Sequence, residues 1–264
     1  MITAKLIGRL GNSMFQIAAC IGYARKYDQQ WLVQEEVLNG ESSIHRVYPN
    51  LPKTHRRART YNEHPDGICP THGDHYNLCR FNYHHIPYMR EDLYLVGFWQ
   101  SWRYFEGQDA EIKSVFALPH VAGYEDYVSI HVRRGDYVQF AGSFPPITVE
   151  YIQQALNKIN TGKAIVFSDD IGWCRANLHH LETSQLKIEY SEGNEHQDLS
   201  LMASCGHHII ANSTFSWWGA YLGHNPDRIV VTPSAKPGSW FGPAGIKTEC
   251  VDLLPPEWIQ IEFR

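Results

Sequence analysis

The stretch from Tyr127 to Tyr137 most constrains what this chain can fold into. Its first half alternates and is rich in β-branched residues, which predicts a buried strand over 127–132, and its second half abruptly becomes charged. Arginine keeps its charge at any relevant pH, and its planar fork of donors matches phosphate or carboxylate oxygens. Because ligands bind at the carboxyl ends of strands in an open α/β sheet, Arg133 and Arg134 predict an anionic ligand. The alternative is a surface ion pair among Arg133, Arg134 and Asp136.

Length and composition indicate a soluble globular chain. Its 264 residues allow one large or two small domains, and the net charge of -5 is not basic enough for general nucleic-acid binding. No run approaches the ~20 apolar residues of a membrane span, and Arg9 and Asn12 come too early for a secretory signal. The six cysteines are irregularly spaced, which favours reduced thiols over a disulfide framework. We therefore expect a cytoplasmic protein, with peripheral attachment to the inner membrane as a further option.

The chain opens as a nucleotide-type βαβ unit. A short strand over 4–7 leads through a glycine turn to a helix over 14–27, with Asn12 or Ser13 as the expected N-cap. The glycines fit neither the dinucleotide fingerprint nor the ATP phosphate loop. A linker over 118–123 places the domain boundary near residue 120. Further strands are predicted over 31–33, 94–99, 164–167, 208–211 and 229–231, and further helices over 102–116, 148–159, 197–205 and 217–222.

Residues 39–90 have little periodicity and are predicted to form loops and short helical pieces. Within them, Cys69, His72, His75 and Cys79 offer two thiols and two imidazoles, which could close a zinc tetrahedron. The spacing fits no familiar zinc module, and His is frequent throughout the chain. A zinc-dependent hydrolase is therefore an alternative only, and no metal site is predicted.

Polar side chains follow several predicted strands at their carboxyl ends, which converge in a doubly wound sheet. Arg133 together with a helix N-terminus at Ser213 and Thr214 would hold a diphosphate, although ordinary helix capping by these hydroxyls is the alternative. Asp169 or Asp170 can accept from both N1–H and the exocyclic amine of guanine. These residues predict a guanine nucleotide diphosphate as the ligand.

Four motifs carry a family resemblance, in order along most of the chain. They resemble those of the α-1,2-fucosyltransferases, glycosyltransferase family 11, and more distantly those of the α-1,6- and protein O-fucosyltransferases. The motifs occupy 8–16, 131–137, 167–170 and 198–220.

The resemblance implies an α/β, GT-B-like fold of two Rossmann-type domains facing a cleft. Residues 1–120 would form the acceptor-side domain and 121–264 the GDP-fucose-binding domain. The implied reaction is an inverting transfer of L-fucose from GDP-β-L-fucose to a galactose 2-hydroxyl of an oligosaccharide or glycolipid acceptor. Neither a metal nor another cofactor is implied, since GDP-fucose is a co-substrate.

The resemblance also assigns roles. Arg133 would grip the β-phosphate, and Arg133, Asn12 and Asp136 are the expected catalytic residues. The identity of the general base stays open among Asp136, a residue of the N-terminal domain, and a departure that needs little base help. The expected substrate-binding residues are Arg9, Gly11, His131, Arg134, Asp169, Asp170, Asp198, Asn212, Ser213, Thr214 and Phe215.

Other functions compete with this one. A second enzyme class keeps the GDP site but transfers fucose to a protein hydroxyl, or uses another GDP-sugar. A binding module, either a lectin or a nucleotide sensor, would bind GDP without turnover. Acceptor and donor screens with purified protein separate these classes.

Overall fold

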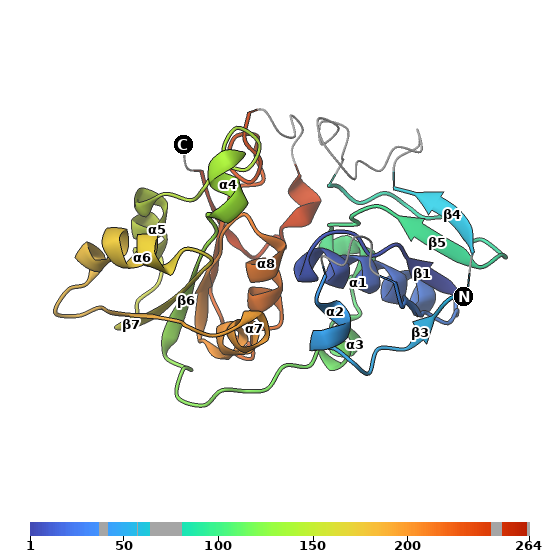
Figure 1. Cartoon of the computed structure of the whole chain (residues 1–264), viewed down its shortest axis with the longest axis horizontal. Coiled ribbons are helices and arrows are strands. Elements are labelled where there is room, and N and C mark those ends of the chain that lie inside the picture. Colours follow the sequence, from blue (N-terminus) through green and yellow to red (C-terminus); the bar gives the residue numbers. More distant parts are fainter. Residues whose placement is uncertain (37–41, 57, 64–80, 244–249, 263–264) are drawn as a thin grey trace. The chain divides into compact units, whose positions relative to one another are not determined.

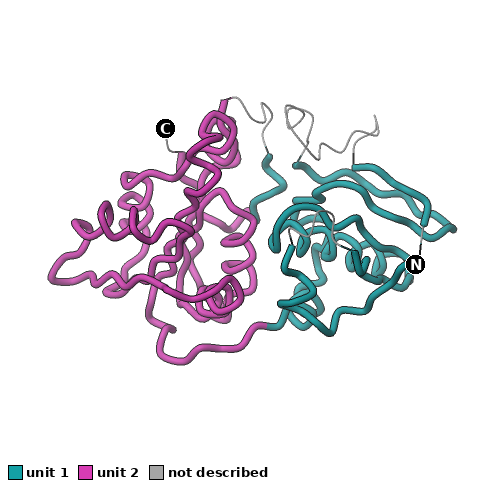
Figure 2. Tube along the Cα trace, viewed as in Figure 1, with its two compact units in different colours: residues 1–117, 250–255 teal, residues 118–249, 256–264 magenta. Residues whose placement is uncertain are grey.

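The computed structural model describes residues 1–36, 42–56, 58–63, 81–243 and 250–262. The chain forms two compact units (Figure 2), which we call unit 1 and unit 2. Unit 1 comprises Met1–Ala117 and Cys250–Pro255, and unit 2 comprises Leu118–Glu249 and Pro256–Arg264. Both are built on parallel strands with helices (Figure 1), which confirms the predicted α/β class. The assignment of acceptor and donor roles to the two parts stays a prediction.

Unit 1 contains a parallel sheet in the order β1-β5-β4, with β5 between its neighbours. A second parallel pair joins β2 to β3, and a bridge from Ile2 to Trp31 connects this region to β1. The strands are β1 (Ile2–Ala4), β2 (Val33–Gln34), β3 (Lys53–Thr54), β4 (Arg59–Asn62) and β5 (Leu93–Val96). The helices are α1 (Leu10–Lys26), α2 (Ile44–Val47), the 3-10 helix η3 (Trp102–Phe105), α3 (Asp109–Val115) and the 3-10 helix η5 (Val251–Leu253).

Three expectations for unit 1 were wrong. The first strand is β1 rather than 4–7, and α1 begins after Arg9, whose side chain makes no capping bond, rather than after Asn12 or Ser13. The helix predicted over 102–116 is two helices, because Gly107 between them has a left-handed φ of 78°. The candidate zinc ligands Cys69, His72, His75 and Cys79 lie outside the described residues.

Unit 2 is a six-stranded parallel sheet in the order β11-β10-β9-β6-β7-β8. Counted within the unit, this is the Rossmann order 3-2-1-4-5-6 read from the other edge. The chain reverses direction across the sheet between β6 and β9, so their carboxyl ends flank the switch point where such sheets bind ligands. The strands are β6 (Tyr127–Val132), β7 (Lys163–Ser168), β8 (Lys187–Tyr190), β9 (His207–Ile209), β10 (Val230–Pro233) and β11 (Ile259–Ile261).

Helices cover both faces of this sheet (Figure 1). The alternation along β6 sends Val128, Ile130 and Val132 into a core with α5 and α6, so His131 points to the other face, towards α8. On that face Ile165 packs with Met202 of α7. The helices are α4 (Gly135–Gln139), α5 (Val149–Leu156), α6 (Ile171–Leu178), the 3-10 helix η4 (His179–Leu181), α7 (Glu195–Ser204) and α8 (Thr214–Tyr221).

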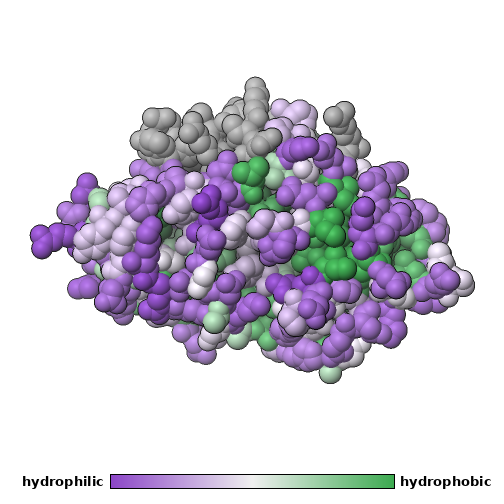
Figure 3. Space-filling view, turned by 180° about the vertical axis from the view of Figure 1, so that it is seen from behind, coloured by the Kyte–Doolittle hydropathy of each residue, from purple (hydrophilic) through white to green (hydrophobic). Residues whose placement is uncertain are grey.

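Within the described ranges, no helix combines the length and the apolar character that a membrane crossing requires. Hydrophilic residues cover most of the face shown in Figure 3, and the largest hydrophobic patch on it lies right of the centre.

Candidate active site

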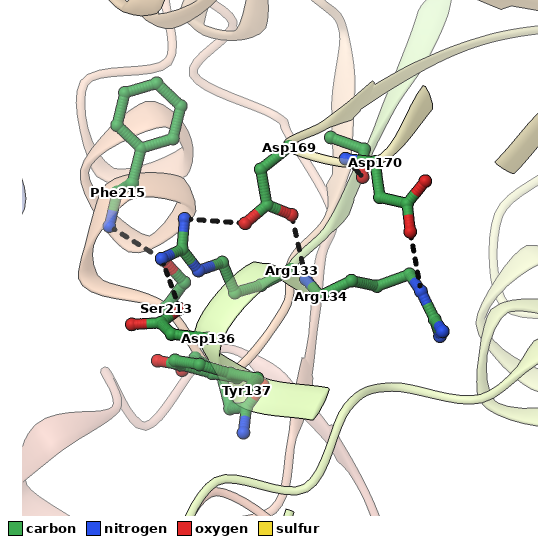
Figure 4. A network of polar contacts seen from close by, with 10 residues as sticks. Arg133, Arg134, Asp136, Tyr137, Asp169, Asp170, Ser213 and Phe215 are labelled. Carbon is green, nitrogen blue, oxygen red and sulfur yellow. Dashed lines mark hydrogen bonds and ion pairs between the residues drawn. The ribbon is translucent and has the colours of Figure 1, made fainter. Parts of the chain in front are cut away.

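The carboxyl end of β6 carries Arg133, whose guanidinium lies between two carboxylates (Figure 4). Its Nη1 is 2.9 Å from Asp169 Oδ2, and its Nη2 donates to Asp136 Oδ1 at 2.5 Å. The guanidinium carbon is 5.4 Å from the ring centre of Tyr137, and the side chain is 16% exposed. The ion pair considered as an alternative for Arg133 and Asp136 therefore exists, and it extends to Asp169 at the end of β7.

Arg134 is held by Asp169 and Asp170, which follow β7. Its backbone N–H donates to Asp169 Oδ1 at 2.9 Å, and its Nε donates to Asp170 Oδ2 at 3.3 Å. Its guanidinium stacks on Trp173, with 3.9 Å to the ring centre. Asp170 also caps α6 by accepting from the Trp173 N–H at 3.0 Å. The position of Trp173 in the first turn after that cap was the available signal for this contact, which the sequence analysis missed.

Gly135 has no room for a side chain. A Cβ at this position would lie 2.4 Å from Asp169 Oδ2. The glycine thus allows the Asp169 carboxylate to reach both Arg133 and Arg134. Asp169 and Asp170, predicted to bind guanine, here bind arginines and backbone N–H groups.

The carboxyl end of β9 delivers Asn212 and the start of α8. Ser213 is the N-cap of α8, and its Oγ accepts from the Phe215 N–H at 3.4 Å, so the capping role considered for it is present. Thr214 is the first residue of α8. The Tyr137 hydroxyl donates to the Asn212 carbonyl at 3.0 Å, which ties α4 to the end of β9. The structure therefore brings both predicted clusters to the switch point.

His131 is buried on this side of the sheet. Burial, followed by the nearby charge of Arg133, lowers the pKa of His131 to about 3, so its imidazole is neutral at physiological pH. Its ring centre is 5.7 Å from that of Phe215. Among the described residues, neither its Nδ1 nor the buried Oδ1 of Asn212 has a hydrogen-bond partner. Buried polar atoms of this kind are candidates for ligand contacts.

Asp198 lies in α7 and interacts with the loop after β8. Its Oδ1 accepts from the Ser191 hydroxyl at 2.5 Å, and burial raises the pKa of the Asp198 carboxyl. No contact recorded among the described residues joins Asp198 to Arg133 or Arg134. Its predicted role in substrate binding stays a prediction.

Arg9, Gly11 and Asn12 belong to unit 1, where they follow β1. The Arg9 carbonyl accepts from the Asn12 N–H at 3.1 Å, and Gly11 is buried in the first turn of α1. Asn12 Oδ1 accepts from Gln100 Nε2 at 2.9 Å. Gly8 has a φ of 77°, and a Cβ there would lie 2.3 Å from Asn12 Nδ2. These three predicted residues therefore lie together at the start of α1.

Across the part of the chain that the structure describes, no group of three or more His, Cys, Asp and Glu side chains is arranged to hold a metal ion.

Comparison with known proteins places the chain in a family. A sequence model of glycosyl transferase family 11 matches residues 1–262. An alpha-1,2-colitosyltransferase of Escherichia coli is 26% identical over 99% of each chain. The galactoside alpha-(1,2)-fucosyltransferase 2 of Sus scrofa is 29% identical over 99% of this chain and 80% of that protein. The crystal structure of NodZ alpha-1,6-fucosyltransferase soaked with GDP-fucose has a TM-score of 0.48 and 12% identity, covering 87% of this chain and 94% of that one. Because the family match runs through nearly every residue, the chain belongs to glycosyl transferase family 11.

Proposed function

We propose that this protein transfers L-fucose from GDP-β-L-fucose to the 2-hydroxyl of a galactose in a glycan acceptor, with inversion and without a divalent metal. Family membership supports a glycosyltransferase. The similarity to galactoside alpha-(1,2)-fucosyltransferase 2 of Sus scrofa, which covers 99% of this chain, supports the sugar and the linkage.

The position of Arg133 carries the proposal. Its guanidinium lies at the switch point of a Rossmann-ordered sheet, fixed by Asp136 and Asp169. A guanidinium has more N–H donors than these two contacts use, so it retains donors for a phosphate. Departure of GDP places negative charge on the diphosphate oxygens. A guanidinium already held in position stabilises that charge more in the transition state than in the ground state.

The start of α8 offers a second favourable environment for the diphosphate. The helix dipole favours an anion at the N-terminus of α8, where Ser213 and Thr214 lie. Since Tyr137 joins α4 to Asn212, the start of α8 and Arg133 are tied to one another within unit 2. Together they would neutralise the leaving group from two sides.

A second donor deserves testing because of one comparison. The colitosyltransferase of Escherichia coli is similar over 99% of this chain. Colitose is fucose without its 3-hydroxyl, so GDP-fucose and GDP-colitose differ by a single sugar hydroxyl. GDP-colitose is therefore the alternative donor.

The test offers purified protein GDP-fucose or GDP-colitose with a panel of β-galactosides and protein acceptors, with and without EDTA. Product mass identifies the transferred sugar, and proton NMR gives the linkage and anomeric configuration. We expect an α-1,2-fucosylated galactoside with undiminished yield in EDTA. Transfer of colitose alone selects the alternative donor, loss of yield in EDTA contradicts metal independence, and GDP binding without transfer to any acceptor contradicts an enzyme.

A further inference from the structure

A second polar edge lies in unit 1, at the carboxyl ends of its three parallel strands. Because β1, β5 and β4 are parallel neighbours, the residues that follow them share one edge of the sheet. The segment 97–100, after β5, lies between the other two strand ends. On one side Gln100 donates to Asn12, which follows β1. On the other side the backbone of this segment binds Glu63, which follows β4.

The Glu63 carboxylate accepts two backbone hydrogen bonds. The Phe98 N–H donates to Oε2 at 2.6 Å, and the Trp99 N–H lies 3.1 Å from both oxygens. A Cβ on Gly97 would lie 2.4 Å from Oε2, so a glycine is required for the carboxylate to come this close. Trp99 has a φ of 54°, a left-handed conformation that is rare for a bulky residue. Backbone strain of this kind concentrates at functional sites.

Glu63 differs from Asp169 and Asp170 of unit 2 because no cationic side chain of the described residues forms an ion pair with it. Burial raises the pKa of Glu63 to about 7, although its two backbone hydrogen bonds act in the opposite direction. Near neutral pH both protonation states are therefore populated. Such a carboxyl can both accept from and donate to a hydroxyl group.

Aromatic rings surround this carboxyl. Tyr61 stacks on Trp99 with ring centres 6.3 Å apart, while His84 and Tyr104 contact Trp99 at 5.4 and 5.3 Å. Tyr61 and His84 are half-buried, and the buried Nε1 of Trp99 has no hydrogen-bond partner among the described residues. Tyr61, His84 and Tyr104 are also the described titratable groups packed around the Glu63 and Trp99 pair.

We propose that this edge of unit 1 binds the neutral saccharide acceptor, with a sugar hydroxyl donating to the Glu63 carboxylate and the sugar ring lying against Tyr61. Amide, carboxyl and aromatic groups without a paired cation suit a polyhydroxylated ring better than a phosphate. The proposal rests on the proposed function, because that function makes the acceptor a galactoside.

The first test measures binding rather than transfer. N-acetyllactosamine is titrated into the full chain by NMR, and GDP by calorimetry, for the wild type, Glu63→Gln, Tyr61→Ala and the control Glu91→Gln. Glu91 is an exposed carboxylate of unit 1 paired with Arg59. We expect Glu63→Gln and Tyr61→Ala each to weaken galactoside binding about tenfold or more, with GDP affinity within about twofold of wild type, and the control to be unchanged.

A purely structural role for Glu63 makes a different prediction. If the role is purely structural, Glu63→Gln should have a lower melting temperature, and galactoside binding by the wild type should not depend on pH. We expect wild-type galactoside binding to strengthen from pH 6 to 8, as the carboxyl ionises, and this dependence to vanish in Glu63→Gln. Tyr61→Ala leaves both backbone bonds to Glu63 in place, so it tests the site even if Glu63→Gln fails to fold.

The outcomes separate this inference from the proposed function. Wild-type galactoside affinity in both variants, or no galactoside binding by the wild type, overturns the site in unit 1. Galactoside binding that depends on Glu63, without transfer from any GDP-sugar, supports the site and contradicts the proposed function instead.

Discussion

The three-stranded sheet of unit 1 and the six-stranded sheet of unit 2 are both parallel, but their carboxyl edges differ in charge. At the edge of unit 2, Asp169 and Asp170 are paired with Arg133 and Arg134. At the edge of unit 1, Glu63 is bound by backbone N–H groups and surrounded by rings. Because Glu63 is buried without a cationic partner among the described residues, its carboxyl resists ionisation. We therefore propose an anion site at the strand ends of unit 2 and a site for uncharged hydroxyl groups at those of unit 1.

The largest effect is expected from removing the guanidinium of Arg133, the centre of the proposed anion site. We expect Arg133→Ala to lower turnover roughly 100-fold or more, and Arg133→Lys to restore little of it, because lysine lacks the bidentate fork. Steady-state kinetics with GDP-fucose measure this. Arg175→Ala, which removes an exposed arginine paired with Glu192 in unit 2, is the matched control and should keep its activity. Near-normal turnover in Arg133→Ala would remove the role assigned to this residue.

Acid should destabilise unit 2 through its buried histidines. Burial, then the charges of Arg228 and neighbouring histidines, lowers the pKa of His208 to about 3. Between pH 6.5 and 3 the unfolded chain binds a proton that the folded chain does not, so stability falls as pH falls. The loss at pH 5 is about 2 kcal/mol for such a histidine. Glu63 acts in the opposite direction. Because its pKa is raised, its contribution to the free energy of unfolding is lost as pH rises through about 7.

Thermal unfolding at pH 5 and pH 7 measures this balance. We expect His208→Gln to reduce the difference in unfolding free energy between the two pH values, whatever its own effect on stability at pH 7. An unchanged difference would show that His208 does not control the acid sensitivity.

A smaller effect should follow from filling the space at Gly135. The Cβ of Gly135→Ala would displace the Asp169 carboxylate and loosen Arg133, so we expect turnover to fall about tenfold while the fold is retained. The matched control is Gly172→Ala in α6, where the nearest atom to a new Cβ is Asp170 Oδ1 at 3.9 Å. Equal kinetics in the two variants would show that Asp169 does not position Arg133.

The smallest expected effect concerns the edge of unit 1. Asn12→Ala removes the hydrogen bond from Gln100 that fixes one side of the segment 97–100. We expect the acceptor KM to rise about fivefold, with the KM for GDP-fucose unchanged, because one hydrogen bond contributes on the order of 1 kcal/mol. Initial rates at varied acceptor concentration test this. A change confined to the donor KM would place Asn12 with the nucleotide instead.

Strand β6 shows what the sequence could predict. Its β-branched alternation and its abrupt charged end predicted the range 127–132, which the structure confirms. The convergence of strand ends likewise predicted that Arg133 and Asp169 would come together. These features depend on burial on both faces of the sheet, which leaves a strong pattern in the sequence.

The edge strands β4 and β8, each with a single paired neighbour, were not predicted. Residues 59–62 contain no apolar alternation, and β8 is only four residues long. Glu63 follows β4, so it could not be identified as a strand-end residue before that strand was known. The contact of Gly135 with Asp169 also could not be predicted, because it depends on the distance between two loops after the sheet has formed.

The left-handed backbone at Trp99 has a consequence for local motion. The amides of Phe98 and Trp99 are held by the Glu63 carboxylate, and no helix or strand ladder shares that task. When the carboxyl takes up a proton or is replaced, these two amides should be among the first in unit 1 to take up deuterium from solvent. Their exchange rates would thus follow the ionisation of a single side chain, with no substrate present.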